Sequence, residues 1–287
     1  MEKHWNKDLK DKTVVFTGGT DGMGKVAAQQ LAEMGAKIML FGRNETKSRQ
    51  AIQEIRKASG NENIHYVHCD LSSQKSIRSA AQEVLDRCPK IDILVNCAGM
   101  NAGERVITEE GMEMSWAVNH LAPFLLNNLL LDRIKASAPA RIINLSSAMQ
   151  KNGHIHLDDI QLTKGWSTLQ SYAQAKLAMN MVTRKMAREL KGTGVTVNAL
   201  NPGFIKTNLL HQIKGWEKII GVPYMHFFAS KPEVGAERIV RLAVSDDFED
   251  VNGQFVYESE IRDPNPEALD DDLVEKVWGL SKEHVGL

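Results

Sequence analysis

The sequence has few of the features that mark secreted or metal-binding proteins. Its 287 residues include only three cysteines, and these show neither the paired spacing of a metal site nor that of a redox motif. Cys69 and Cys97 each end a short apolar run, so we expect them to be small core residues rather than disulfide partners. This cysteine usage does not require an oxidising compartment.

Long apolar runs and an excess of one charge are also missing. Residues 1–12 are polar and charged, unlike a signal peptide. The longest apolar stretch, Leu121–Leu131, is interrupted by one proline and two asparagines, whereas a membrane-spanning helix needs about 20 apolar residues. The 35 basic and 36 acidic residues give a formal net charge of -1, which offers no general attraction to nucleic acid or anionic lipid. We therefore expect a cytoplasmic protein with no membrane anchor and no nucleic-acid partner.

What the chain does contain is an alternation of short apolar runs and amphipathic helical stretches. The apolar runs are typical of strands buried on both faces. They are Thr13–Thr17, Ala36–Phe41, Ile64–Cys69, Ile91–Val95, Arg141–Leu145, Val195–Leu200 and, late in the chain, Gln254–Tyr257. The clearest helical stretches between them are 77–85, 112–135, with a bend expected at Pro123, and 170–191. This alternation predicts an α/β fold of the Rossmann type, a doubly wound parallel sheet of about seven strands in three layers.

No linker, repeat or shift in composition divides the chain, so we expect a single domain over residues 1–287. Two stretches, 148–169 and 204–230, stand outside the alternation and follow predicted strands. Open α/β sheets bind ligands at the carboxyl ends of their strands. We therefore expect a substrate-loop insertion near 204–230. The aromatic residues expected to line a cleft there are Trp166, Trp216, Phe227 and Phe228.

A glycine-rich turn follows the first predicted strand. Gly18, Gly22 and Gly24 have the spacing Gly-x-x-x-Gly-x-Gly and lead into a helix. Glycine permits a tight turn and a close approach to a pyrophosphate, and the helix N-terminus adds amide donors and a partial positive charge. The position of the turn within a strand–helix–strand unit predicts a dinucleotide site that includes Thr20 and Met23. The alternative is a turn that binds no ligand.

The end of the second predicted strand indicates which dinucleotide is bound. Sites for NAD usually carry an acidic residue there, about 20 residues past the glycines. This chain instead reads Gly42-Arg43-Asn44, without a carboxylate. The Arg43 guanidinium can form charge-assisted, forked hydrogen bonds with a 2′-phosphate. We therefore predict NADP as the cofactor, with an exposed arginine that has no partner as the alternative.

Four polar residues indicate acid–base chemistry. Tyr172 and Lys176 are four residues apart in a helical stretch and share one face, so the ammonium should lower the pKa of the phenol. Ser147 ends the fifth predicted strand, where its hydroxyl can bond a developing alkoxide. Asn119 lies in a long helix and needs a buried partner, such as backbone or a water that links Lys176 to solvent. Taken alone, the Tyr–Lys pair is common on helix surfaces, and Asn119 fits a packing or helix-bending residue.

In their order along the chain, these motifs resemble the short-chain dehydrogenase/reductase family over residues 12 to 257. The matching segments are Thr17-Gly18-x-x-x-Gly22-x-Gly24, Cys69-Asp70-Leu71, Asn96-Cys97-Ala98-Gly99, Asn119, Ser147, Tyr172-x-x-x-Lys176 and Asn201-Pro202-Gly203. The Gly42-Arg43-Asn44 strand end and the 24 residues between Ser147 and Tyr172 resemble the retinol-dehydrogenase-like branch, which generally uses NADP.

The resemblance implies a role for each matching residue. The catalytic group would be Asn119, Ser147, Tyr172 and Lys176, with Tyr172 as acid/base and Lys176 also bonding the nicotinamide ribose. The remaining cofactor contacts would be Gly18, Thr20, Gly22, Met23, Gly24, Arg43, Asn44, Asp70, Leu71, Asn96, Ala98, Gly99, Pro202, Gly203 and Thr207. Asp70 would bond the adenine amino group, Asn96 would also stabilise the central sheet, and Thr207 would reach the nicotinamide carboxamide.

The implied activity is transfer of a hydride between NADP(H) and a carbonyl or alcohol carbon of an apolar small molecule. Two alternatives are an NADP(H)-binding redox sensor without chemistry and a C=C reductase of the same fold. His154-x-His156, with Asp158 and Asp159, has zinc-like spacing, but the family chemistry needs no metal, and we expect a solvated loop. The acidic stretch 263–287 fits a surface helix or a subunit contact, which leaves a homo-oligomer open.

Overall fold

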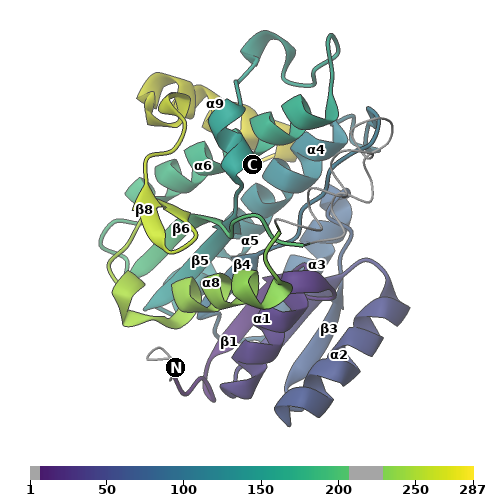
Figure 1. Ribbon diagram of the computed structural model, residues 1–287, viewed down its shortest axis with the longest axis vertical. Helices are drawn as coiled ribbons and strands as arrows, with labels where there is room; N and C mark the ends of the chain where they lie inside the picture. The colour runs from purple at the N-terminus through teal and green to yellow at the C-terminus, as the bar shows by residue number, and fades with distance from the viewer. Residues whose placement is uncertain (1–6, 207–228) are drawn as a thin grey trace.

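The computed structural model describes residues 7–206 and 229–287 of the chain. Within these ranges the strands form one eight-stranded sheet in the order β3-β2-β1-β4-β5-β6-β7-β8. The first seven strands pair in parallel, and β8 pairs antiparallel with β7. Helices cover both faces of the sheet, which gives three layers (Figure 1). The predicted α/β class and the doubly wound topology are confirmed.

Every apolar run that predicted a strand forms one, and the bounds differ from the prediction by at most two residues. The strands are β1 Thr13–Thr17, β2 Lys37–Gly42, β3 Ile64–His68, β4 Ile93–Asn96, β5 Ala140–Leu145, β6 Val195–Asn201, β7 Phe255–Tyr257 and β8 Glu260–Arg262. The exposed three-residue strand β8 was not predicted. Strand β3 is not buried on both faces, because it lies at the sheet edge, where Tyr66 is half-buried and His68 is exposed.

The helices divide into two groups, one on each face of the sheet. The α-helices are α1 Gly22–Glu33, α2 Glu45–Ser59, α3 Gln74–Arg87, α4 Met114–Trp116, α5 Ala122–Lys135, α6 Thr168–Glu189, α8 Pro232–Val244 and α9 Asp271–Val285. One core cluster joins α1, α2 and α8 to the sheet, and α1 and α8 lie side by side in Figure 1. The other joins α3, α5, α6 and α9. The carboxyl ends of the strands therefore lie between two layers of helices, each packed against one face of the sheet.

The stretch predicted as a helix over 112–135 is helical from Met114 to Lys135, but its hydrogen-bonding pattern changes within it. A π-helical turn, η1 Ala117–Leu121, separates α4 from α5. Pro123 follows it in the first turn of α5, where a proline is tolerated because its missing N–H would be unpaired there anyway. The break thus falls just before the proline rather than at it. Single π-turns are frequent at functional sites, and this one contains Asn119.

The C-terminal stretch forms α9, which packs against its own chain. Trp278 meets Phe124 of α5 edge to face, with ring centroids 5.0 Å apart. Arg188 of α6 forms an ion pair with Asp271 at the start of α9. Among the described residues, no helix is both long enough and apolar enough to cross a bilayer. Most of the predicted insertion at 204–230, including Trp216, Phe227 and Phe228, lies outside those residues.

Candidate active site

A pocket of about 580 Å³ opens at the carboxyl ends of the central strands. That volume lies within the range of about 300–1,000 Å³ that small-molecule sites commonly have. The pocket brings together many of the residues that the sequence singles out. These are Gly18, Thr20, Gly22, Met23, Gly24, Ala98, Gly99, Ser147, Tyr172, Lys176, Pro202 and Gly203.

The glycine-rich turn packs so closely that a side chain would not fit at two of its positions. Gly18 has φ +74°, and a Cβ on it would lie 2.6 Å from the Ala98 nitrogen. A Cβ on Gly24 would lie 2.2 Å from the Gly18 carbonyl oxygen. At Gly22 a Cβ would meet no atom within 4 Å, so this part of the turn is open. The turn therefore presents bare backbone at the N-terminus of α1, as a pyrophosphate site requires.

Arg43 lies at the other end of the dinucleotide site. Its side chain is 75% exposed, and its Nη1 lies 4.0 Å from Oδ2 of Asp70, so the residues predicted for the 2′-phosphate and the adenine are neighbours. A Cβ on Gly42 would lie 2.1 Å from the Ser48 Oγ, which leaves no room for an acidic side chain at the strand end. The Asn44 Oδ1 accepts a hydrogen bond from the Lys47 backbone nitrogen at 2.9 Å and caps α2.

Lys47 is a cation of this region that sequence reasoning missed. Its Nζ lies 2.7 Å from Oδ2 of Asp21, a residue of the glycine-rich turn that lines the pocket. The signal for it was available, because Lys47 stands four residues after Arg43, close to the start of α2. Two cations therefore lie close to the end of β2, and one of them, Lys47, pairs with a residue that lines the pocket.

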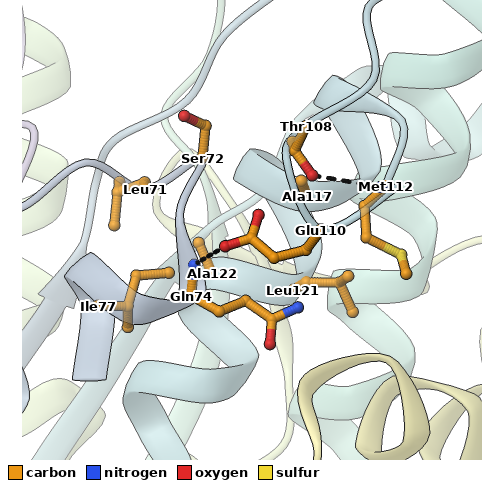
Figure 2. Close-up of a pocket in the computed structure, with 10 residues that line it drawn as sticks. All are labelled: Leu71, Ser72, Gln74, Ile77, Thr108, Glu110, Met112, Ala117, Leu121 and Ala122. Carbon is orange, nitrogen blue, oxygen red and sulfur yellow. Dashed lines mark hydrogen bonds between the residues drawn. The ribbon is translucent and has the colours of Figure 1, made fainter.

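Five described residues predicted as cofactor contacts do not line the large pocket: Arg43, Asn44, Asp70, Leu71 and Asn96. The Asn96 amide donates to Oδ1 of Asn127 at 2.7 Å and to Oδ1 of Asn144 at 2.8 Å, so its side chain ties β4 to β5 and α5. Leu71 lines a separate small pocket of about 10 Å³, which has room for roughly one water. Figure 2 shows this pocket, where the Glu110 carboxylate accepts a hydrogen bond from the Gln74 backbone nitrogen.

Tyr172 and Ser147 meet at the centre of the large pocket. Tyr172, on α6, is 9% exposed, and a hydrogen bond joins its side chain to that of Ser147, at the end of β5. Burial raises the pKa of the Tyr172 phenol to about 12, and the bond to Ser147 opposes this only in part. The expectation that Lys176 lowers this pKa below its usual range is wrong for the structure, because desolvation of the phenolate outweighs the other effects.

Lys176 lies one helical turn from Tyr172 and is buried. Its Nζ donates a hydrogen bond to the Leu145 carbonyl oxygen at 2.6 Å and lies 5.7 Å from the centroid of the Tyr172 ring. Burial lowers the pKa of the Lys176 ammonium to about 8. The predicted juxtaposition of the two side chains on one helix face is therefore present, with the ammonium anchored to the end of β5.

The Asn119 side chain forms hydrogen bonds with backbone, one of the two kinds of partner predicted from the sequence. Its Oδ1 accepts a hydrogen bond from the Met100 nitrogen at 3.0 Å, and its Nδ2 donates to the Met100 carbonyl oxygen at 2.9 Å. A Cβ on Gly99 would lie 3.1 Å from the Asn119 Oδ1 and 3.7 Å from the Lys176 Nζ. Asn119 thus fixes the loop after β4 beside Lys176.

Several residues that line the pocket were not singled out as site residues. They are Asn101, Ser146, Met149, Leu169, Asn201, Phe204, Ile205 and Tyr257. Cys97, expected in the core, is only partly buried and lines the pocket as well, because the chain leaves the sheet at this point. Trp166 does not line it, since its indole nitrogen donates to the buried Glu113 carboxylate at 3.1 Å.

The two histidines with zinc-like spacing have side-chain partners in the structure. His154 pairs with Glu267 of the short helix η6, Pro266–Leu269. His156 Nε2 lies 2.9 Å from Nε2 of Gln170. In the described ranges, no group of three or more His, Cys, Asp or Glu side chains is arranged to hold a metal ion. Thr207, predicted to reach the nicotinamide, lies outside those ranges.

Comparison with known proteins identifies the class to which this fold and pocket belong. The sequence model of the short chain dehydrogenase family matches residues 12–218. The chain therefore belongs to the short chain dehydrogenase family, which consists of oxidoreductases that use a nicotinamide cofactor.

Particular relatives narrow the resemblance to retinol dehydrogenases. Retinol dehydrogenase 13 of Homo sapiens is 40% identical over 285 residues, with 97% of this chain and 86% of that protein covered. Retinol dehydrogenase 14 of Homo sapiens is 35% identical, with coverages of 97% and 88%. Among solved structures, an uncharacterised protein from Mycobacterium paratuberculosis has a TM-score of 0.79 at 26% identity, with coverages of 98% and 95%. The chain is thus retinol-dehydrogenase-like.

Proposed function

We propose that this protein is an NADP(H)-dependent oxidoreductase that interconverts a carbonyl and an alcohol on a largely apolar small molecule. The observation that carries the proposal is the convergence of Ser147, Tyr172 and Lys176 on one pocket with the glycine-rich turn. The names of the relatives support an alcohol or carbonyl substrate, since retinol is an alcohol. The cytoplasmic location expected from the sequence stays a prediction.

The residues present fit a bound NADP(H). Bare backbone at Gly18 and Gly24 suits a pyrophosphate, and Arg43 with Lys47 suits a 2′-phosphate. The buried Asn201 Nδ2 has no hydrogen-bond partner in the described part of the chain and lies in the pocket wall beside Pro202, where the carboxamide oxygen of a bound nicotinamide could accept a hydrogen bond from it. When bound, the cofactor supplies or accepts the hydride.

The chain's own residues handle the substrate oxygen and its proton. Ser147 and Tyr172 both present hydroxyl groups to the pocket, so both can hydrogen-bond a carbonyl oxygen there. With a pKa of about 12, Tyr172 is protonated at neutral pH and can donate its proton as the oxygen becomes negative. This protonation state suits carbonyl reduction better than alcohol oxidation. Asn119 holds the loop at Met100, next to Gly99, and the hydrogen bond from Lys176 to the Leu145 carbonyl oxygen holds the ammonium in place.

Replacing Tyr172 by phenylalanine tests the assignment. General acid catalysis typically contributes about 10²–10⁴-fold, so we expect kcat for carbonyl reduction to fall by about 100-fold or more. The reaction is followed by NADPH absorbance at 340 nm with a panel of aldehydes and ketones. The dissociation constant for NADPH should stay within about threefold, because the variant removes one hydroxyl and keeps the ring.

The matched control is Tyr66→Phe, which removes the same hydroxyl from the edge strand β3, outside the pocket. Because this hydroxyl donates to the Gly42 carbonyl oxygen at 3.1 Å, next to Arg43, kcat is compared at saturating NADPH. We expect this variant to turn over like the wild type. Normal turnover by Tyr172→Phe, with NADPH bound normally, would refute the proposed chemistry. A parallel titration with NADH tests the preference for NADP(H), which fails if the two cofactors bind equally well.

A further inference from the structure

The loop after β4 is held on both sides of one residue. On one side, Met100 exchanges two backbone hydrogen bonds with the Asn119 amide, at 3.0 and 2.9 Å. On the other side, the Ala102 carbonyl oxygen accepts a hydrogen bond from the Thr168 Oγ1 at 2.8 Å. Thr168 begins α6, the helix that carries Tyr172. The residue between these anchors, Asn101, is therefore fixed relative to the proposed catalytic side chains.

Asn101 is a buried amide with unused hydrogen-bonding capacity. It is 6% exposed, and its Oδ1 has no hydrogen-bond partner in the part of the chain that the structure describes. Buried side-chain amides nearly always have a partner, and leaving one without is unfavourable. The side chain lines the same pocket as Ser147 and Tyr172. We therefore expect a ligand in this pocket to supply the hydrogen-bond partner that the Asn101 amide lacks.

The pocket that the Asn101 amide lines also has apolar side chains. Met149, Leu169 and Phe204 line the same pocket, and the last two are 49% and 44% exposed. In binding sites of this kind a few polar groups fix the orientation of a mostly apolar ligand. An amide can serve as donor or acceptor, since rotation about the Cβ–Cγ bond exchanges its two ends.

We propose that Asn101 determines substrate specificity by hydrogen-bonding a second polar group, a hydroxyl or carbonyl, on an otherwise apolar substrate. This inference rests on the proposed function, in which Ser147 and Tyr172 bind the reacting oxygen and leave Asn101 for another atom. The substrate class is accordingly a carbonyl compound, or the corresponding alcohol, that carries a further oxygen function. Asn101 takes no part in the hydride or proton transfer.

The test compares probe pairs of equal shape in the wild type and in Asn101→Leu, which keeps the size of the side chain and removes its amide. The pairs are 3-(hydroxymethyl)benzaldehyde with 3-ethylbenzaldehyde, the corresponding 4-substituted pair, and 1-hydroxy-2-octanone with 3-nonanone. The measured quantity is the ratio of kcat/KM between the hydroxyl and the apolar member of each pair. Intrinsic reactivity cancels when this ratio is compared between the two proteins.

For at least one pair we expect the ratio to fall about tenfold in Asn101→Leu, the size of effect that one buried hydrogen bond produces. The fall should come mainly from the hydroxyl compound, with the apolar member reduced at a similar or higher rate. Asn128→Leu is the matched control, because it makes the same substitution on α5, at a residue that does not line the pocket. The ratio should not change in this control.

The outcomes separate this inference from the proposed function. If the wild type reduces the probes and no ratio changes by more than threefold in Asn101→Leu, the role of Asn101 is refuted and the proposed function stands. A tenfold loss of NADPH affinity in Asn101→Leu would instead assign the amide to the cofactor and refute a substrate contact. If neither these probes nor the wider panel supports NADPH oxidation, the proposed function fails and the inference fails with it.

Discussion

Acidification should destabilise the protein through one buried histidine next to the proposed site. His120 lies in the π-helical turn beside Asn119 and is fully buried. Its Nε2 is 2.7 Å from the Ser281 Oγ on α9, and its ring centroid is 4.2 Å from that of Trp116. Burial, with a smaller effect of His284, lowers the pKa of His120 from 6.5 to about 3.

The sign and size of the effect follow from this pKa. Above pH 6.5 the imidazole is neutral in the folded and unfolded chains, and its contribution to stability is constant. Between pH 6.5 and about 3 the unfolded chain binds a proton that the folded chain does not, so the free energy of unfolding decreases as pH falls. The slope is about 1.4 kcal/mol per pH unit. Acidification from pH 6.5 to 5 should therefore remove about 2 kcal/mol.

Urea unfolding at pH 7 and pH 5, with wild type and His120→Gln, measures this contribution. Glutamine does not titrate, and its amide can still hydrogen-bond the Ser281 hydroxyl. The decrease between the two pH values should be about 2 kcal/mol smaller in the variant. Contributions from His65 and His284, whose pKa values are also lowered, are common to both proteins and cancel. Equal decreases in the two proteins would show that His120 takes up its proton while folded, and would refute the reasoning.

Three further substitutions test the cofactor site and the sheet. Gly24→Ala should weaken NADPH binding at least about tenfold in a fluorescence titration, because the new methyl group would lie 2.2 Å from the Gly18 carbonyl oxygen. Unchanged binding would contradict the close packing of the turn. Arg43→Ala should raise KM for NADPH about 10- to 100-fold, because a charge-assisted hydrogen bond to the 2′-phosphate is lost, and it should leave KM for NADH unchanged. Equal effects on both cofactors would exclude a 2′-phosphate contact. Asn144→Ala should lower the free energy of unfolding by about 2 kcal/mol, because the buried Thr183 hydroxyl loses its hydrogen-bond donor and the Asn96 amide loses one of its acceptors. An unchanged urea midpoint would contradict this.

Much of the fold could be predicted because its signals are local. The apolar runs gave the strands β1 to β7, and the carboxyl-edge rule for parallel sheets placed Ser147 and the glycine-rich turn at one end of the sheet. The spacing of Tyr172 and Lys176 required only that their stretch be helical. Strand β8 carries no such signal, since its three residues are exposed and pair with β7 only after a turn at Glu258, whose φ is +60°.

What could not be predicted depends on which groups the fold brings together. The upward pKa shift of Tyr172 results from burial by segments distant in the sequence, so the spacing to Lys176 gave the wrong direction. Asn96 was expected to stabilise the sheet as well as to contact the cofactor, but its particular partners, Asn127 and Asn144, belong to other elements and could not be read from the sequence. Asn101 carries no motif, and its unused amide becomes apparent only when its burial and its neighbours are known.

The opposite pKa shifts of Tyr172 and Lys176 have one cause, burial, which makes the phenol a weaker acid but strengthens its attraction to the ammonium once its proton has left. Burial disfavours a phenolate and an ammonium alike, and among the described residues the Lys176 ammonium forms no ion pair. On the proposed mechanism, departure of the Tyr172 proton creates a negative charge on a phenol whose ring centroid lies 5.7 Å from the ammonium, in surroundings where attraction is poorly screened. This attraction is absent before proton transfer and develops with it. Only interactions that strengthen toward the transition state accelerate a reaction, so desolvation, which raises the pKa of the resting phenol, also increases the contribution of Lys176 when the proton leaves.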